Sequence, residues 1–262
     1  MNSTLKTALF SFSPISLKEM NSVAFLHRVD TKFILNASML NELLNDIMHD
    51  YFILDIDNRR CFNYSTMYYD TPELSMYIDH IRGKLNRFKV RHRHYVDSDL
   101  SYIEVKFKNN SGRTSKWREK RSATKQKSEI LDNYLLKKHL PHHFRNLKAV
   151  LQNNFHRITL VDKNFTQRVT IDYDISYLLP DAEQKKQVLS DLVIIEIKSD
   201  KNKEKNGIQQ SLKKLRIKQS GFSKYCIGVA LTDTSKEKAG ALKPKFVKIN
   251  KLTKNAVLTH NL

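Results

Sequence analysis

The segment from Arg87 to Arg93 constrains the fold more than any other part of this sequence. Positively charged side chains stand at every second position, with Phe88, Val90 and His92 between them. Because alternate side chains of a β-strand point to opposite faces, this spacing predicts a strand with one cationic and one largely apolar face. Like charges in a row repel one another, so the cationic face must meet water or an anionic ligand. The simpler alternative is a solvated edge strand whose Lys and Arg residues discourage aggregation.

The same alternation recurs in other segments, which mix cations with carboxylates. These segments are 25–35, 101–108, 115–121, 168–174 and 193–198. So many charged strand faces suggest strands around a common polar interior, because a closed barrel places alternate residues of every strand inside. An interior of Arg and Lys cannot be dry, since unpaired buried charges are very costly. The pattern predicts an interior that holds water and an anionic ligand.

The balance of charges also points to an anionic partner. Lys and Arg total 46 against 27 Asp and Glu, which gives a formal net charge of +19. This excess favours nucleic acid, polyphosphate, nucleotides or an acidic membrane face without choosing among them. The two cysteines show no metal-binding spacing, and we expect a reducing, cytoplasmic setting. No apolar run approaches the roughly 20 residues of a membrane helix, so no integral membrane segment is expected.

The chain is long enough for one large domain with about eight strands and helices in the connections. Helical spacing of apolar residues predicts helices at 38–48, 128–140 and 208–218. We expect an N-terminal lead-in at 1–22 and a main domain at 23–234. A lysine-rich tail follows at 235–262, where seven lysines oppose the single Glu237. Its composition predicts disorder.

Two Glu-x-Lys pairs on apolar strands are candidates for metal binding. Glu104 precedes Lys106, and Glu196 precedes Lys198 in the more apolar strand. A carboxylate beside a phosphate suits Mg²⁺ or Mn²⁺, whereas the plainer interpretation of either pair is an ion pair within the sheet. Glu196 is the better candidate because its apolar strand requires a partner or a metal. No glycine-rich phosphate loop is present, so side chains must hold any phosphate.

Several motifs in a fixed order resemble one known family, the VTC (vacuolar transporter chaperone) domain. The motifs are His27–Phe33, Ser65–Thr71, Asn86–Tyr95, Tyr102–Lys106, Lys116 with Arg118, Arg157, Arg168–Asp172, Val193–Lys198 and Phe222–Tyr225. That domain is the polyphosphate polymerase branch of the triphosphate tunnel metalloenzymes. The resemblance spans roughly residues 23–231.

The resemblance implies an α+β, CYTH-like fold with an antiparallel eight-stranded closed β tunnel and connecting helices. It implies a metal-dependent phosphotransferase that transfers the γ-phosphate of ATP to polyphosphate, with Glu196 as the ligand of Mn²⁺ or Mg²⁺. Matching motifs make Arg91, Arg93, Lys106, Arg157 and Lys224 catalytic. Further contacts to substrate phosphates would come from Arg28, Lys32, Arg87, Lys89, Lys116, Arg118, Arg168 and Lys198.

Two positions depart from the family pattern. Asp30 stands where the family usually has Glu, and Gly221 stands where the family has a second lysine. Lys218 is a candidate replacement for that lysine. ATP and polyphosphate are the expected partners and nucleic acid is not, while an association with a membrane partner stays open.

Three other functions compete with polyphosphate synthesis. One is hydrolysis of triphosphates by the same fold, and another is binding of polyphosphate or acidic proteins without catalysis. The third is a nucleic-acid-binding or nuclease protein, in which Asp181 or Asp191 would join a Glu-x-Lys strand. In that case Phe88, Tyr95, Tyr102 and Trp117 would be stacking platforms. A mixed sheet with crossover helices would favour the nuclease.

Overall fold

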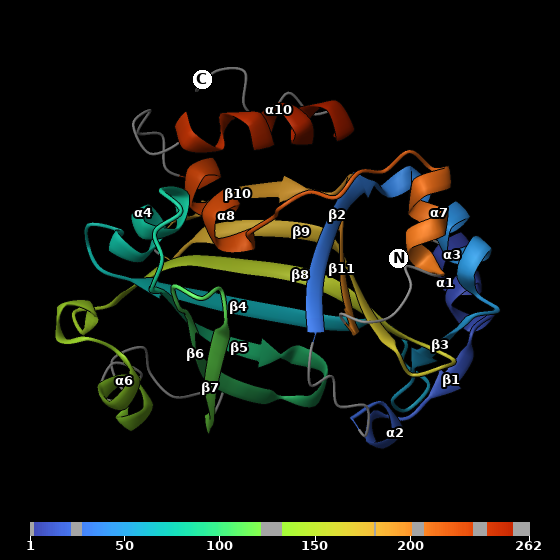
Figure 1. Cartoon of the computed structure of the whole chain (residues 1–262), viewed down its shortest axis with the longest axis horizontal. Coiled ribbons are helices and arrows are strands. Elements are labelled where there is room, and N and C mark those ends of the chain that lie inside the picture. Colours follow the sequence, from blue (N-terminus) through green and yellow to red (C-terminus); the bar gives the residue numbers. More distant parts are fainter. Residues whose placement is uncertain are drawn as a thin grey trace. The chain divides into compact units, whose positions relative to one another are not determined.

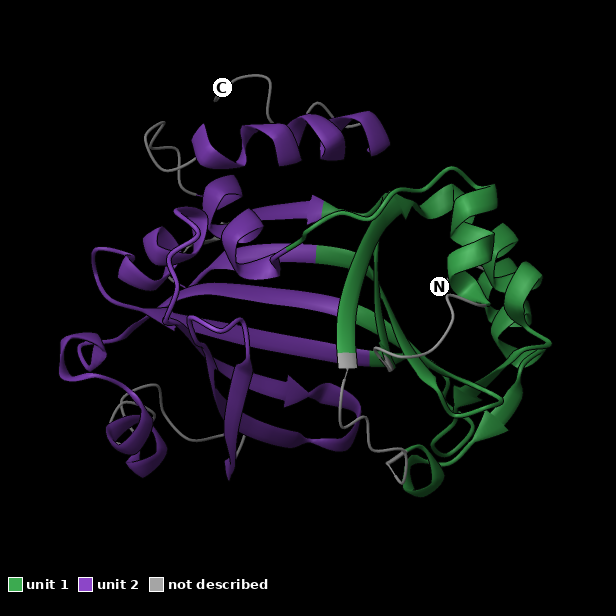
Figure 2. Cartoon of the chain, viewed as in Figure 1, with its two compact units in different colours: residues 1–62, 156–175, 189–222 green, residues 63–155, 176–188, 223–262 purple. Residues whose placement is uncertain are grey.

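The computed structural model describes residues 3–21, 28–121, 133–180, 182–200, 207–232 and 240–253. They divide into two compact units (Figure 2). Unit 1 comprises residues 1–62, 156–175 and 189–222, and unit 2 comprises residues 63–155, 176–188 and 223–262. The strands β8 (Lys148–Asp162) and β9 (Gln167–Leu179) contribute to both units. The division follows no linker, and the domain boundaries expected at 22/23 and 234/235 stay predictions.

The other elements are short compared with β8 and β9 (Figure 1). The strands are β1 (Ser13–Ile15), β2 (Arg28–Asn36), β3 (Tyr51–Leu54), β4 (Phe62–Asp70), β5 (Arg87–Tyr95), β6 (Leu100–Lys108), β7 (Thr114–Arg121), β10 (Ala182–Leu189) and β11 (Leu192–Asp200). The α-helices are α1 (Ser3–Phe10), α2 (Leu17–Asn21), α3 (Leu40–Ile47), α4 (Ser75–Ile81), α6 (Tyr134–His139), α7 (Ile208–Lys214), α8 (Lys224–Thr232) and α10 (Lys243–Leu252). Four 3-10 turns are η1 (Ala37–Met39), η2 (Val96–Ser98), η3 (His142–Phe144) and η4 (Gly240–Leu242).

The strands form one hydrogen-bonded sheet whose main order is β2-β11-β9-β8-β4-β5-β6-β7. The pairs β2/β11, β11/β9, β4/β5, β5/β6 and β6/β7 are antiparallel. Outside this path, β10 pairs with β9, while β3 pairs antiparallel with β8 and parallel with β1. The expected antiparallel character of the sheet and its connecting helices are confirmed.

The prediction of a closed eight-stranded tunnel is wrong in two respects. The sheet has 11 strands, and within the described ranges β2 and β7 end the main order without pairing with each other. Alternating charges show only that alternate side chains share a face. Closure depends on whether the two edge strands meet. The length and stagger of the strands decide this, and the pattern of side chains does not encode it.

In unit 1 the sheet is apolar on one face. Phe33 and Leu35 of β2 belong to the same core as Val193, Ile195 and Ile197 of β11. That core also contains buried residues of α1, α3 and α7, the helices that lie together beside this part of the sheet in Figure 1. The alternate residues of β2 and β11, which include Lys32 and Glu196, therefore belong to the other face.

Unit 2 repeats the arrangement with different strands. Val90 of β5 packs in one core with Ile103 and Val105 of β6, together with Met76 of α4 and Leu136 of α6. Trp117 of β7 packs against the same core. The predicted apolar face behind the cations of β5 is thus confirmed, and two helices cover it.

A buried carboxylate, Asp70, joins the end of β4 to α4 and α8. Asp70 accepts hydrogen bonds from the backbone N–H groups of Thr71 (2.7 Å), Met76 (2.9 Å) and Tyr77 (2.9 Å). Its fourth donor is the hydroxyl of Tyr225 in α8. Burial raises the pKa of Asp70, and these donors oppose that shift because they favour the ionised form. The interaction fixes where α8 begins.

Residue 228 of α8 must be glycine for this helix to approach the strands so closely. A Cβ atom there would lie 2.4 Å from the side chain of Leu151 and 2.5 Å from that of Tyr177. Asp70 and Gly228 together locate the first residue of α8, Lys224, which the family resemblance assigns to phosphate.

The structure also contains elements that the sequence pattern did not predict. The lead-in contains α1, β1 and α2, and strands β3 and β10 were missed. The predicted tail disorder is wrong for α10, because Phe246 and Ile249 are buried. Two apolar residues three positions apart were too weak a signal among so many lysines. Residues 130 and 131, on which the helix expected at 128–140 depended, lie outside the described residues, and α6 covers the later part.

We expect Tyr225→Phe to lower the free energy of unfolding by about 1.5–3 kcal/mol, because it removes a donor from a buried carboxylate. Denaturant unfolding followed by circular dichroism measures the change. Tyr134→Phe is the matched control, because Tyr134 is 70% exposed. Equal stability of the two variants would contradict the anchoring role of Asp70.

Candidate functional site

The cationic row of β5 continues across β6 and β7 of unit 2. The strand registers pair Lys89 with Lys106 and Lys106 with Lys116, and they pair Arg91 with Glu104 and Glu104 with Arg118. One sheet face therefore carries Arg87, Lys89, Arg91, Arg93, Lys106, Lys108, Lys116, Arg118 and Lys120. We call this set the unit 2 cationic face. The charged faces expected at 101–108 and 115–121 thus lie in register with that of β5.

Glu104 is the carboxylate at the centre of the unit 2 cationic face. Its side chain is 2% exposed, and its Oε2 atom lies 2.6 Å from Nε of Arg91, while Oε1 contacts the ammonium group of Lys116. Burial alone would raise the pKa of Glu104, but the charges of Arg91, Arg93 and Lys116 outweigh it and lower the pKa to about 2. Glu104 is therefore ionised and engaged in ion pairs, which holds two cations in place.

Lys116 is a cation of this face whose charge depends on pH. Burial lowers the pKa of Lys116 to about 8, and Arg91 and Arg93 add to the shift while Glu104 opposes it. Its side chain is 41% exposed, so solvent weakens the effect. Arginine, in contrast, stays charged at pH values around the pKa of Lys116.

Aromatic rings contact two of the arginines of unit 2. The guanidinium carbon of Arg93 lies 5.6 Å from the ring centre of Tyr64, and that of Arg118 lies 5.1 Å from the ring of Tyr102. Such stacking orients a guanidinium group while leaving its charge available.

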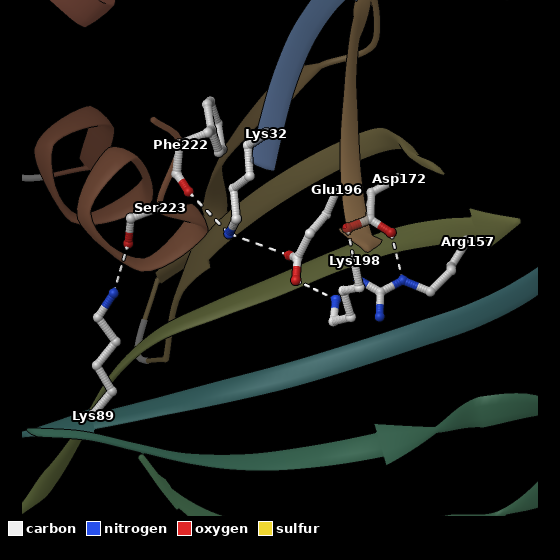
Figure 3. Close-up of polar contacts among 8 residues, drawn as sticks. All are labelled: Lys32, Lys89, Arg157, Asp172, Glu196, Lys198, Phe222 and Ser223. Atoms are coloured by element: carbon white, nitrogen blue, oxygen red, sulfur yellow. Dashed lines mark hydrogen bonds and ion pairs between the residues drawn. The ribbon is translucent and has the colours of Figure 1, made fainter. Parts of the chain in front are cut away.

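The first residues of α8 lie beside this face. The ammonium group of Lys89 donates a hydrogen bond to Oγ of Ser223 (3.0 Å; Figure 3). The Ser223 hydroxyl also accepts from the backbone N–H of Cys226 and so caps the helix. The next residue, Lys224, places its ammonium group 4.5 Å from the ring centre of Phe155. Sequence reasoning did not assign Ser223 a role, although a serine directly before a helix is a recognised cap signal.

Unit 1 carries a second cluster of charges, centred on Glu196 of β11. Its carboxylate contacts the ammonium groups of Lys32 on β2 (3.2 Å) and of Lys198 on its own strand (Figure 3). Lys32 also donates to the carbonyl oxygen of Phe222 (3.4 Å). Burial would raise the pKa of Glu196, but Lys32 and Lys198 outweigh burial and hold this pKa well below its usual range. Glu196 is therefore a carboxylate at neutral pH.

Arg157 and Asp172 form a bidentate ion pair in the same unit. Nε and Nη2 of Arg157 donate to the two carboxylate oxygens of Asp172 at 2.6 and 2.7 Å, and Asp172 is 4% exposed. This geometry fixes the plane of the guanidinium group. Asp172 was recognised only as one member of an alternating charged strand, because its partner on β8 is 15 residues away.

The structure places the remaining predicted residues around these two clusters. Arg168 pairs in register with Lys198 and donates to the carbonyl oxygen of Met20 (2.6 Å). Arg28 begins β2 opposite Asp200, and its side chain lies outside what the structure describes. Asp30 pairs in register with Lys198. Lys218 is exposed, next to Gln219, which bridges to Phe33.

Comparison with protein families identifies the chain. The model of the VTC domain matches residues 27–233, most of its length. The chain belongs to the VTC domain family. No curated protein matches the sequence significantly.

Solved structures resemble the backbone of this VTC domain at low sequence identity. An adenylate cyclase candidate from Bacillus halodurans matches with a TM-score of 0.48 and 12% identity, covering 75% of this chain and 94% of that one. An adenylyl cyclase candidate from Hippeastrum, described as having a dominant triphosphatase activity, gives a TM-score of 0.43 at 12% identity, with coverages of 76% and 94%. A protein from Pyrococcus horikoshii gives a TM-score of 0.41 at 12% identity, with coverages of 73% and 91%.

The residues that could hold a metal in the described part of this VTC domain are single carboxylates rather than a cluster. No cluster of three or more His, Cys, Asp or Glu residues occurs among those residues. Glu196 supplies one ionised carboxylate, which fits Mg²⁺ or Mn²⁺ when phosphate oxygens and water complete the coordination. Glu104 fits less well, because it is buried between Arg91 and Lys116.

In the described ranges no helix is long and apolar enough to span a membrane.

We expect the affinity for triphosphate to fall as the pH rises from about 7 to about 9, because Lys116 loses its proton near pH 8. Lys116→Arg should make this fall a few-fold shallower, since arginine stays charged. The affinity of both proteins for triphosphate is measured by calorimetry at both pH values. Comparing the two proteins at the same pH removes the effect of protonation of the triphosphate itself. Lys120→Arg, the same change at an exposed residue of β7, should behave as the wild type. Identical profiles for Lys116→Arg and the wild type would exclude Lys116 from the binding surface.

Proposed function

We propose that this VTC domain protein is a metal-dependent phosphotransferase that transfers the γ-phosphate of ATP to a polyphosphate chain. The observation that carries the proposal is the unit 2 cationic face, where Glu104 is the one carboxylate among the registered residues of that face and faces nine Lys and Arg residues. Such a face is stabilised by a dense polyanion. Family membership supports the same ligand class.

Phosphoryl transfer suits residues of this kind. The reaction requires mainly positioning and neutralisation of charge, with little covalent chemistry by the protein. Arg91 and Arg93 would bind phosphate oxygens as fixed forks, and Lys106 and Lys116 as point charges. The ion pair with Glu104 would preorient Arg91, so that less conformational entropy is lost when phosphate binds.

In unit 1 we assign Lys32 and Lys198 to phosphate and Glu196 to a divalent metal. A bound Mg²⁺ or Mn²⁺ would neutralise charge that develops on the transferred phosphoryl group. Phosphate binding would draw Lys32 and Lys198 away from Glu196 and expose its carboxylate to the metal. Arg157, already oriented by Asp172, would contribute its remaining edge to a phosphate oxygen.

Synthesis and hydrolysis differ in the acceptor of the phosphoryl group. In synthesis a terminal polyphosphate oxygen attacks the γ-phosphorus, and ADP leaves with the electrons of the broken P–O bond. In hydrolysis water attacks instead and orthophosphate forms. A face that extends over three strands offers more cations than one triphosphate requires, which favours a second, polymeric substrate and hence synthesis.

A nuclease is the weaker alternative. The main strand pairs are antiparallel, and Asp191 lies five residues before Glu196, about 17 Å along an extended strand. Asp181 lies outside the described residues. Two of the suggested stacking platforms are occupied, because Phe88 stacks on Phe107 at 4.6 Å and Trp117 stacks on His139 at 4.1 Å.

Incubation with ATP and Mn²⁺, followed by gel analysis for polyphosphate and an assay for orthophosphate, tests the proposal. We expect long polyphosphate from the wild type and at least ten-fold less from Glu196→Gln, because the amide loses the charge that attracts the metal. Binding of triphosphate without metal should persist in the variant. The control is Glu42→Gln, an exposed residue of α3. Orthophosphate without polyphosphate would establish hydrolysis, and triphosphate binding without turnover would establish a non-catalytic binder.

Gly221 offers a test by gain of function. A Cβ atom at this position would meet no atom within 4 Å, and the residue is exposed beside Phe222, whose carbonyl contacts Lys32. We expect Gly221→Lys, which restores the lysine of the family pattern, to raise triphosphate affinity several-fold through one added charge. Gly221→Ala supplies the same Cβ without the charge and should leave affinity unchanged. An unchanged affinity in Gly221→Lys would mean that this position is remote from the ligand.

A further inference from the structure

Four aromatic rings of unit 2 lie side by side across neighbouring strands of the sheet. The strands are β8, β4, β5 and β6 (Figure 1), and the rings, in the same order, are Phe155, Tyr64, Tyr95 and Tyr102. Successive ring centres lie 5.1, 5.0 and 5.9 Å apart. We call these four residues the aromatic row.

The aromatic row borders one end of the unit 2 cationic face. Tyr95 follows Arg93 by two positions on β5, so both side chains lie on the same face of the sheet. The strand registers pair Tyr95 with Tyr64, and they pair Arg93 with Tyr102. The ring of Tyr95 therefore comes directly after the last arginine of the β5 row, about 6.6–7 Å farther along the strand.

Positive charges lie over both ends of the aromatic row. The ammonium group of Lys224 lies 4.5 Å from the ring centre of Phe155, and the guanidinium carbon of Arg118 lies 5.1 Å from that of Tyr102. Tyr95 and Tyr102 are half-buried, so part of each ring is open to solvent. The surface thus combines aromatic rings with cations, which suits a ligand that joins a flat base to a chain of phosphates.

Tyr95 and Tyr102 are the members of the row that can accept another flat group. Tyr64 is already stacked on Phe155, with 12° between the two ring planes. The ring of Tyr95 is inclined by 55° to that of Tyr64 and by 82° to that of Tyr102. In the part of the chain that the structure describes, no ring therefore lies parallel to Tyr95 or Tyr102. A planar base can stack on either of them without displacing an aromatic neighbour.

We propose that Tyr95 and Tyr102 bind the base of the nucleoside triphosphate substrate and thereby set the direction of its phosphates. The inference rests on the proposed function and adds a nucleoside subsite to it. Arg93, Arg91 and Lys89 follow Tyr95 in this order along one face of β5. A base on the aromatic row therefore directs the α-phosphate toward Arg93 and the γ-phosphate toward Lys89.

Calorimetric titration of ATP and of sodium triphosphate, without divalent metal so that no turnover occurs, tests the inference. We expect Tyr95→Leu and Tyr102→Leu each to weaken ATP binding about ten-fold, because stacking on an aromatic ring is lost. Triphosphate has no base, so its affinity should stay unchanged. Tyr102→Phe keeps the ring and should retain both affinities.

Tyr134→Leu is the matched control. Tyr134 of α6 is 70% exposed and also has a cation over its ring, since the ammonium group of Lys138 lies 5.6 Å from the ring centre. This variant removes the same ring away from the sheet and should alter neither affinity. Circular dichroism and the retained affinity for triphosphate show that each variant is folded.

Two outcomes would overturn the inference while leaving the proposed function intact. Equal losses of ATP and triphosphate affinity in the Leu variants would mean that the rings act only by holding the neighbouring arginines. Unchanged ATP affinity in both Leu variants would mean that the base lies elsewhere. Failure of the wild type to bind either ATP or triphosphate would instead contradict the proposed function itself, and the inference with it.

Discussion

Repulsion between like charges governs the polar faces of this protein. A sheet face that carries many Lys and Arg residues is stable only when carboxylates, solvent or an anion reduce the repulsion. In unit 2 Glu104 lies between Arg91 and Lys116, and in unit 1 Glu196 lies between Lys32 and Lys198. Both carboxylates stay ionised despite burial because the neighbouring cations outweigh its effect on their pKa values. Each carboxylate therefore neutralises part of its cluster and orients the rest.

The side chains at the beginning of α8 are positioned by residues that lie outside the cationic face. Asp70 holds the start of α4 and the hydroxyl of Tyr225, and Gly228 permits α8 to pack closely on β8 and β9. These contacts locate Ser223 and Lys224 at the beginning of α8. The matching motifs thus combine charged residues of the candidate site with residues that stabilise the supporting helix. Loss of the second kind would reduce activity through stability and position rather than through contact with the substrate.

The two Glu-x-Lys strands place their carboxylates in different surroundings. Glu104 is almost inaccessible and bound to cations from two other strands, whereas Glu196 keeps a larger exposed fraction and one of its lysines comes from its own strand. The spacing alone allowed either to be a metal ligand or an ion-pair partner. Burial and partner geometry distinguish the two glutamates as metal candidates, because a metal would have to displace or share the cations that already contact the carboxylate.

The sequence by itself determined which side chains share a strand face, because the alternation of side chains is a local property of extended backbone. The strands β5, β6, β7 and β11, and the cationic face of β5, could be predicted on that basis. Pairings such as Arg157 with Asp172 and Asp70 with Tyr225 were decided only by the tertiary structure, since they depend on strand register and helix packing between distant segments. The same holds for the open order from β2 to β7 and for the burial of Phe246 in a lysine-rich helix. Both depend on which surfaces meet after folding, and the local periodicity of the sequence does not encode these tertiary contacts.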